Sequence, residues 1–233
     1  MSPLHLLRIP VRVPQLLRFA AEHGITSPDE TLGYTLHAWF TALFGDAAPK
    51  PFRCLERRQE VLAYASTDAT TLLQHAQTFA SPLAWAALDA QGVASKPMPH
   101  AWRPGQRVRV EVLTCPVARH GDEEKDIYLR ALDRMGDAAP TRGEVYSAWF
   151  VRQWAGAAQL EDVELLGMQA QSPLLRRDRS LGQNRLKRVQ RPQALFAANA
   201  TVEDGERFAA LLARGIGRHR AFGFGMVLLA PPR

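Results

Sequence analysis

The residues best suited to chemistry lie near the end of the chain, in G-I-G-R-H-R-A-F-G-F-G-M, residues 215–226. Glycine adopts positive φ and lets the backbone approach a ligand closely, so successive N–H groups can converge on an anion. The arginines make phosphate the expected anion, and the aromatic side chains favour nucleic acid over a free nucleotide. The predicted RNA-binding residues of this loop are Gly215, Gly217, Arg218, His219, Arg220, Phe222, Gly223 and Gly225.

The surroundings of this loop exclude several nucleotide-binding motifs. A dinucleotide fingerprint needs G-x-G-x-x-G between a strand and a helix, whereas here Arg220 replaces the third glycine and the loop follows a predicted helix. No Gly-Lys-Ser/Thr of a Walker A loop occurs. The aromatic strand motif of single-strand RNA readers needs a further helix and strand, and only seven residues follow Met226. A phosphate-binding loop and a glycine-rich turn that closes a domain are the two readings left.

A second candidate lies in the segment G-Y-T-L-H-A-W-F-T-A-L-F-G, residues 33–45. At about 100° per residue, its apolar side chains form one stripe of a helix, which comprises Leu32, Leu36, Trp39, Phe40 and Leu43. Tyr34 falls nearly opposite this stripe, and His37 falls at its edge, so the two are i, i+3 neighbours on a face that the core does not use. An imidazole beside a phenol can serve acid–base catalysis or bind phosphate, although a histidine beside a tyrosine is often only a surface pair.

The excess positive charge of the protein is confined to one segment. The chain carries 29 basic and 23 acidic residues, a net charge of +6. Seven basic residues and one acidic residue lie between positions 176 and 191, which leaves 22 of each sign elsewhere. The basic residues are Arg176, Arg177, Arg179, Arg185, Lys187, Arg188 and Arg191, of which the first six are predicted RNA-binding residues. We expect a basic β-hairpin that contacts phosphates; the alternative is a solvated charged loop.

Two successive sets of predicted elements would position these residues. The first set comprises a strand at 4–13, a short helix at 15–23, a helix at 27–45, strands at 51–56 and 60–65, a helix at 68–80 and a strand at 93–100. Ser27 and Glu30 have the spacing of a capping box, and Asp68 is the expected cap of the later helix. The order βαββαβ is that of a ferredoxin-like unit.

The second set repeats this order after the Pro- and Gly-containing stretch 96–105. It comprises a strand at 107–117, helices at 123–135 and 142–155, strands at 163–171 and 194–202 on either side of the basic segment, a helix at 203–212 and a strand at 226–230. Thr141 and Glu144 are expected to cap the second of these helices. The sequence therefore predicts an α+β fold of two tandem ferredoxin-like (RRM-like) modules with antiparallel sheets, at 1–100 and 106–233.

The composition is that of a folded globular protein. The chain has 233 residues, of which 46% are hydrophobic and 22% charged. Its two cysteines, Cys54 and Cys115, lie far apart without metal-ligand spacing, so neither a disulfide framework nor a zinc site is expected. The sequence shows neither the apolar core of a signal peptide nor an apolar run of about 20 residues. We therefore expect a cytoplasmic protein without a membrane partner.

Three of these segments, taken in order, resemble the CRISPR precursor-RNA endoribonucleases of type I-E, the CasE family. They are residues 33–45, the strand end V-L-T-C-P-V-A-R at 112–119, and the glycine loop at 215–226. The resemblance extends over the whole chain. It implies the tandem ferredoxin-like fold reached above, and places the family's catalytic histidine at His37 and its tyrosine at Tyr34. The family loop has a lysine where this chain has Arg220, a departure that keeps the charge.

The resemblance also implies an activity and its partners. Family members cut the repeat RNA at the base of its stem-loop without metal or other cofactor, by attack of a ribose 2′-OH on the adjacent phosphate. They hold the product crRNA and remain with other subunits in the CRISPR surveillance complex. Their second-module hairpin grips the RNA stem, which corresponds to the 176–191 region here. His37 would then act as general base or general acid, and Tyr34 would orient the phosphate or assist proton transfer.

Two alternatives of other classes remain at this point. The protein could be an RNA-binding subunit without catalytic activity, in which His37 is only a surface residue. An oxidoreductase that binds a nucleotide in the glycine loop is disfavoured, because the loop lacks the strand-then-helix setting.

Overall fold

The computed structural model describes residues 3–25, 32–99, 101–121, 123–178 and 185–232. The chain divides into two compact units. Unit 1 comprises Met1–His100, Pro173–Gln190 and Ala221–Gly223, and unit 2 comprises Ala101–Ser172, Arg191–Arg220 and Phe224–Arg233. The predicted modules were continuous stretches, whereas these units exchange segments. The basic segment, apart from Arg191, and three residues of the glycine loop thus belong with the first hundred residues, and the module boundary itself stays a prediction.

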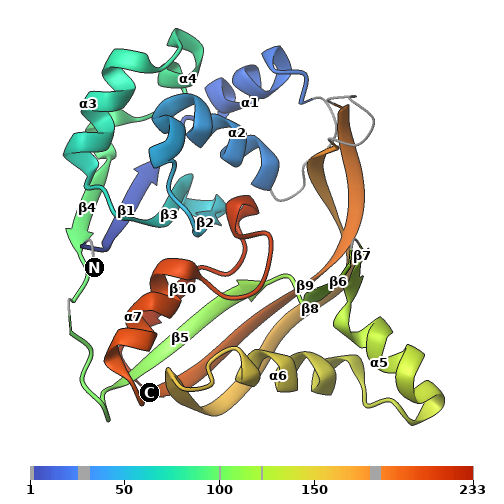
Figure 1. Ribbon diagram of the computed structural model, residues 1–233. Helices are drawn as coiled ribbons and strands as arrows, with labels where there is room; N and C mark the ends of the chain where they lie inside the picture. Colours follow the sequence, from blue (N-terminus) through green and yellow to red (C-terminus); the bar gives the residue numbers. More distant parts are fainter. Residues whose placement is uncertain (1–2, 26–31, 100, 122, 179–184, 233) are drawn as a thin grey trace. The chain divides into compact units, whose positions relative to one another are not determined.

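Unit 1 contains a four-stranded antiparallel sheet with helices packed on it (Figure 1). Its elements are β1 (His5–Pro10), α1 (Val13–Glu22), α2 (Gly33–Phe44), β2 (Phe52–Leu55), β3 (Glu60–Ala65), α3 (Ala69–Phe79), α4 (Pro82–Ala86) and β4 (Ala94–Pro97). The strand order β2-β3-β1-β4 arises because β1 pairs with both β3 and β4. This order, with helices after the first and third strands, is the predicted ferredoxin-like topology.

The core of unit 1 lies between this sheet and its helices. Alternation along β1 buries Leu7 and Ile9 fully and exposes Arg8 between them. From α2, Trp39 and Phe40 enter the same core, where Phe40 meets Phe52 of β2 edge to face. The indole N–H of Trp39 donates to a backbone carbonyl of α4 at 2.9 Å, which satisfies its one polar group. The predicted apolar stripe of α2 is confirmed by this packing.

The start of α2 differs from the sequence-based expectation. The helix begins at Gly33, and its N-cap is Leu32, which has a left-handed backbone (φ 51°) and no side-chain capping bond. The predicted capping box of Ser27 and Glu30 lies outside the described residues. The prediction for α3 is confirmed, because the carboxylate of Asp68 accepts a hydrogen bond from the Thr71 N–H at 2.8 Å.

Unit 2 repeats the topology with an added hairpin. Its elements are β5 (Arg107–Thr114), β6 (Val117–His120), β7 (Glu123–Asp126), α5 (Ile127–Met135), α6 (Arg142–Arg152), β8 (Ala158–Asp178), β9 (Arg185–Val202), α7 (Gly205–Arg214) and β10 (Val227–Ala230). The four-stranded sheet has the order β10-β5-β9-β8, and β6 pairs with β7 separately. The second sheet thus matches the first strand for strand, which confirms the tandem ferredoxin-like prediction.

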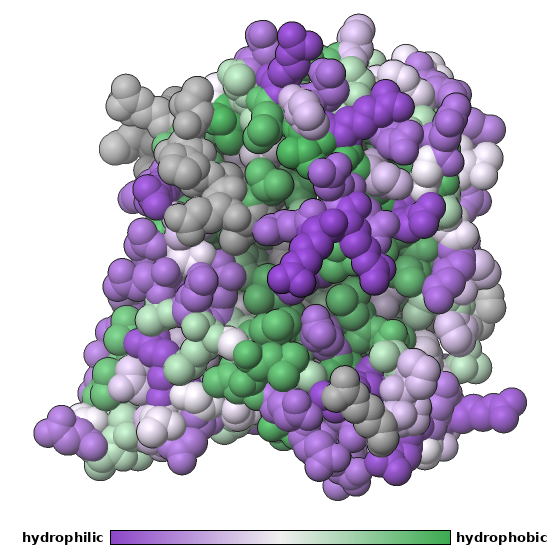
Figure 2. Space-filling model, turned by 180° about the vertical axis from the view of Figure 1, so that it is seen from behind, coloured by the Kyte–Doolittle hydropathy of each residue, from purple (hydrophilic) through white to green (hydrophobic). Residues whose placement is uncertain are grey.

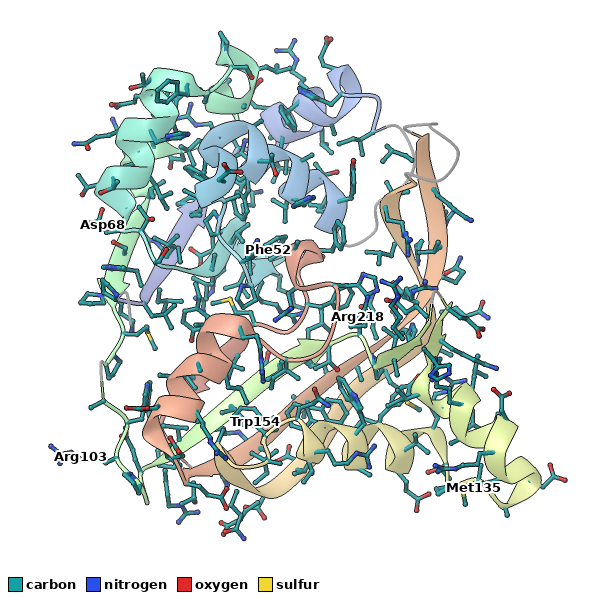
Figure 3. The ribbon with its side chains drawn as sticks, in the orientation of Figure 1. Phe52, Asp68, Arg103, Met135, Trp154 and Arg218 are labelled. Carbon is teal, nitrogen blue, oxygen red and sulfur yellow. The ribbon has the colours of Figure 1, made fainter. Side chains whose placement is uncertain are left out.

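Aromatic side chains fill the core of unit 2. Alternate valines of β5 point to one face, where the ring of Phe196 on β9 stacks on Phe150 of α6 at 4.4 Å between centroids. Trp154, labelled in Figure 3, is fully buried beside Phe150 and Phe208. On α6, Thr141 and Glu144 form the predicted capping box. These helices are held by aromatic packing and by their caps together.

The segment before α5 corrects one prediction. A helix was expected from Glu123, but residues 123–126 form strand β7, and α5 begins only at Ile127. The cause is local, because the Asp126 carboxylate accepts the Tyr128 N–H at 2.8 Å and caps the helix there. Pro116 follows the end of β5, so the strand predicted to reach Val117 stops at Thr114.

The strands on either side of the basic segment are much longer than predicted. β8 extends to Asp178 and β9 starts at Arg185, so most of the basic segment is strand rather than loop (Figure 1). The first part of β8 and the last part of β9 belong to unit 2, whereas the segment Pro173–Gln190 belongs to unit 1. Adjacent charged residues, such as Arg176 with Arg177 and Lys187 with Arg188, interrupt the apolar–polar alternation by which a strand is predicted from sequence.

The molecular surface adds two facts. Figure 2 shows apolar side chains gathered over the lower part of the face drawn, where the sheet of unit 2 lies, and Leu166 and Met168 of β8 are 49% and 50% exposed. Among the described helices, none combines the length and the apolar composition needed to cross a bilayer.

Candidate active site and nucleic-acid interface

His37 lies in the middle of α2 and is half-buried. The helix fixes its backbone, and the Thr41 hydroxyl donates to its carbonyl oxygen at 2.9 Å. Within the described ranges, no donor or acceptor hydrogen-bonds to either nitrogen of the His37 ring. An imidazole without such a partner has both nitrogens available to a ligand.

Tyr34 occupies a different environment from the one expected. The helical pattern placed it on a face outside the core, but its side chain is only 6% exposed. It lies in a small second cluster with Ala20, Ile25 and Leu175, against which Leu186 and Phe222 also pack. The helical wheel was correct about the side of α2 and wrong about its exposure, because strands distant in sequence cover that side.

This small cluster brings the basic hairpin to α2. Leu175 of β8 and Leu186 of β9 face Tyr34, and the alternation of a strand turns their neighbours Arg176 and Lys187 outward. Both of these basic residues are exposed. Unit 1 therefore contains the histidine–tyrosine pair and a basic strand surface in one compact body. No local sequence pattern marks this proximity, because about 140 residues separate the two segments.

Phe222 joins the same group from the glycine loop. It ends the short 3₁₀ helix Arg220–Phe222 and belongs to unit 1. Its ring stacks on Tyr34 with centroids 6.2 Å apart, and it meets the His37 ring edge to face at 5.2 Å. Tyr34 and His37 are themselves 6.3 Å apart in an edge arrangement. The predicted pair of α2 and an aromatic residue of the glycine loop, which were predicted separately, thus lie in contact.

The surroundings of His37 favour its neutral form. Partial burial lowers the pKa of His37 from its ordinary value of 6.5, and the positive charge of Lys50 lowers it further. A neutral imidazole near pH 7 accepts a proton readily, which is the property of a general base. The local chemistry thus comprises a proton acceptor, an aromatic wall and an adjacent exposed cationic strand pair.

In unit 2, a single carboxylate binds most of the polar side chains of the glycine loop. Glu124 of β7 contacts Arg218 at 2.6 Å, His219 at 2.7 Å and Arg191 of β9 at 2.7 Å, and its side chain is 7% exposed. Burial opposes ionisation, but hydrogen bonds from these three partners outweigh it and hold the pKa of Glu124 well below its usual range. Sequence reasoning missed Glu124, which no motif marks.

This cluster changes the interpretation of the loop. Arg218, labelled in Figure 3, and His219 were predicted to bind RNA, but Arg218 forms an ion pair with Glu124, and a ring nitrogen of His219 contacts the same carboxylate. Arg220 donates to the Arg214 carbonyl at 2.7 Å. The Arg218 side chain remains 43% exposed, so it retains N–H groups for a ligand, whereas that of His219 is 9% exposed. Their RNA contacts stay predictions.

Backbone conformation and close packing explain why glycine occupies these positions of the loop. Gly215, Gly217, Gly223 and Gly225 all have positive φ, the region that glycine favours. A Cβ at Gly225 would lie 2.2 Å from the Ile216 carbonyl oxygen, and one at Gly217 would lie 3.1 Å from Trp149. Close packing therefore explains these two positions without a bound phosphate.

The structure describes the side chains of only some of the predicted RNA-binding residues of the hairpin. Arg176, Lys187 and Arg188 are exposed on the two strands. Arg179 lies outside the described residues; Arg177 and Arg185 lie in strands, and only their backbone is described.

Comparison with known proteins finds a matching family and several solved structures of similar fold. The model of a family described as CRISPR associated protein matches residues 4–231. A structure of the CRISPR endoribonuclease Cse3 bound to 19 nt RNA is 20% identical, with a TM-score of 0.65, and the match covers 98% of this chain and 100% of that one. Cse3 of Thermus thermophilus bound to an RNA representing a pre-cleavage complex is 19% identical, with a TM-score of 0.62 and coverage of 98% and 100%.

A third match is the CRISPR-associated protein Cas6e from Escherichia coli K-12, which is 18% identical, with a TM-score of 0.52 and coverage of 98% and 100%. At such identities these structures establish a common fold. No curated protein sequence matches the chain significantly.

Proposed function

Because the chain belongs to the family of CRISPR associated proteins, we propose that it is an endoribonuclease that cleaves CRISPR repeat RNA at the base of a stem-loop. The structures of similar fold include one named as the CRISPR endoribonuclease Cse3 bound to 19 nt RNA and one named as Cse3 bound to an RNA representing a pre-cleavage complex. The observation that carries the proposal is the presence, in unit 1 and beside an exposed basic strand pair, of a histidine whose ring nitrogens have no hydrogen-bond partner among the residues that the structure describes.

The proposed reaction is an internal transesterification of the RNA. The 2′-oxygen of the nucleotide before the cut forms a bond to the adjacent phosphorus, and the bond from phosphorus to the 5′-oxygen breaks. The 2′-hydroxyl gives its proton to a base, and the departing 5′-oxygen receives one. The products are a 2′,3′-cyclic phosphate and a 5′-hydroxyl. Since the nucleophile belongs to the RNA, the protein has to enforce in-line geometry and transfer protons.

His37 is the proposed general base. Its lowered pKa leaves the imidazole neutral at pH 7, so it can accept the 2′-hydroxyl proton. Such proton transfer contributes about 10²–10⁴-fold to a rate. Tyr34 is proposed to orient the phosphate or assist proton transfer beside His37. This division of work needs no metal ion, and the absence of a metal requirement is itself part of the proposal.

The basic strands supply the binding surface. A-form RNA has a narrow major groove, so proteins recognise its helix chiefly through phosphates and shape. Arg176, Lys187 and Arg188 are proposed to contact phosphates near the base of the stem. The loop residues Arg218 and Arg220 are proposed as further phosphate contacts. The product crRNA would stay bound, and the protein would remain with other subunits of a cytoplasmic CRISPR surveillance complex.

The decisive experiment is single-turnover cleavage of the cognate repeat RNA by the full-length protein in EDTA. We expect one new 5′-hydroxyl end at the base of the stem, and no product from an RNA with a 2′-deoxy sugar before the cut. The variant His37→Ala should bind that deoxy RNA as tightly as the native protein does.

His37→Ala should also cleave the native repeat about 10²–10⁴-fold more slowly. A stable complex without any fragments from the native protein would identify a binding subunit and contradict the proposal. Undiminished cleavage by His37→Ala would remove that residue from the mechanism.

A further inference from the structure

The ring of Phe222 lies closer to the proposed catalytic imidazole than the ring of Tyr34 does. Their edge-to-face contact at 5.2 Å between centroids, with an interplanar angle of 75°, is within the favourable range for aromatic pairs. The same ring stacks on Tyr34 at an interplanar angle of 18°. One side chain from the glycine loop therefore contacts both proposed catalytic residues.

Packing is what orients the His37 ring. The imidazole of a histidine is usually fixed by a hydrogen bond at one nitrogen, and none is present within the described parts of unit 1. The helix backbone restricts the first side-chain torsion but leaves the ring free to turn about the second. Contact with Phe222 and Tyr34 restricts that second rotation.

Phe222 is itself held in place. The next residue, Gly223, has φ +89°, and a Cβ there would lie 3.5 Å from the Phe52 ring in the core of unit 1. The Phe222 ring also packs against the small cluster of Tyr34, Ala20 and Leu175. A ring that packs on this cluster, with its neighbouring backbone close to Phe52, can serve as a fixed wall.

We propose that Phe222 is a positioning residue, which holds the His37 imidazole in the orientation that RNA cleavage needs and shields the contacted side of that ring from water. This inference rests on the proposed function. It replaces the role predicted for Phe222 from the sequence, that of an RNA-binding residue.

The shielding has a consequence for proton affinity. The groups that act on His37 are Lys50, whose charge disfavours the imidazolium, and the neighbouring phenol of Tyr34. Removing the Phe222 ring admits water and stabilises the charged form, so the pKa of His37 should rise toward 6.5. For a general base, the acid side of the pH–rate profile should then move to higher pH.

The test uses Phe222→Leu and Phe222→Tyr in the full-length protein. In Phe222→Leu, we expect single-turnover cleavage at saturating RNA to fall about 10–100-fold, since small misplacement of a reacting group costs up to about 10²-fold. Affinity for the 2′-deoxy RNA should stay within about 3-fold. Phe222→Tyr keeps the ring and should restore cleavage.

A second measurement needs no RNA. NMR titration of the His37 side chain in the free protein should give a higher pKa for Phe222→Leu than for the native protein. The matched control is Phe79→Leu, because Phe79 is 72% exposed and contacts a different histidine, His75, at 4.9 Å. This control should change neither the His37 titration nor cleavage.

Two results would overturn the inference. One is an unchanged His37 titration in Phe222→Leu. The other is affinity for deoxy RNA that falls 10-fold or more while cleavage at saturation is retained, which would make Phe222 an RNA contact. If His37→Ala cleaved normally, the proposed catalytic role would fail, yet the titration would still decide whether Phe222 controls His37.

Discussion

Two histidines, one in each motif that the sequence marks, have opposite environments. His37 of α2 is half-buried, and its ring nitrogens have no hydrogen-bond partner in the described ranges. His219 of the glycine loop is 9% exposed and bound to the buried Glu124 at 2.7 Å. A histidine whose nitrogen is paired inside the fold contributes to stability, whereas one without a partner is available for chemistry.

The largest expected effects are a loss of cleavage when His37 is replaced and a loss of stability when His219 is replaced. His37→Ala should lower cleavage about 10²–10⁴-fold and lower the free energy of unfolding by no more than about 1 kcal/mol, because it removes ring contacts but no hydrogen bond of the ring within the described residues. His219→Ala should lower the free energy of unfolding by about 1–3 kcal/mol, because it removes one hydrogen-bonding partner from a buried carboxylate. Urea unfolding and single-turnover cleavage of both variants would measure this. Equal losses of stability in the two variants would contradict the contrast.

The carboxylate that holds His219 gives the second prediction. The pKa of Glu124 is lower in the folded protein than in the unfolded chain, so its ionised form stabilises the fold above about pH 4.5. This contribution is lost as the pH falls below 4.5 toward the folded pKa. Glu124→Gln should lower the free energy of unfolding by about 3 kcal/mol at pH 7, because Arg191 and Arg218 lose their counter-charge.

The pH dependence separates this effect from general damage. The difference in unfolding free energy between native protein and Glu124→Gln should shrink as the pH is lowered from 6 to 3. A difference that stays constant over this range would mean that the charge of Glu124 is not what stabilises the loop.

The third and smallest effect compares basic residues of the hairpin that differ in exposure. Arg176, Lys187 and Arg188 are exposed, unlike Arg191, whose side chain is 18% exposed and bound to Glu124. Replacing the three exposed residues by alanine should leave stability within about 0.5 kcal/mol and reduce the slope of log affinity against log salt by up to about 2.7.

Arg103, Arg134 and Arg152 provide the matched control, since all three are exposed residues of unit 2 outside the hairpin, and Arg103 is labelled in Figure 3. Their triple alanine variant removes the same charge. An equal decrease in the salt slope for both triple variants would show that net charge matters and the hairpin does not.

Much of this architecture is readable in the amino-acid sequence. The caps at Asp68 and Thr141 and the apolar stripe of α2 are local features, determined by side chains within a few residues of one another. The ferredoxin-like order follows from the succession of such elements. His37 and Tyr34 were singled out by the spacing of two residues on one helix.

Contacts between distant segments could be decided only by the tertiary structure. The burial of Tyr34 depends on Leu175, and the pairing of Arg218 and His219 depends on Glu124, almost a hundred residues earlier. Phe222 meets His37 across more than 180 residues of chain. A local pattern records which face of an element is apolar, but which segment covers that face is set by long-range packing, to which each single residue contributes little.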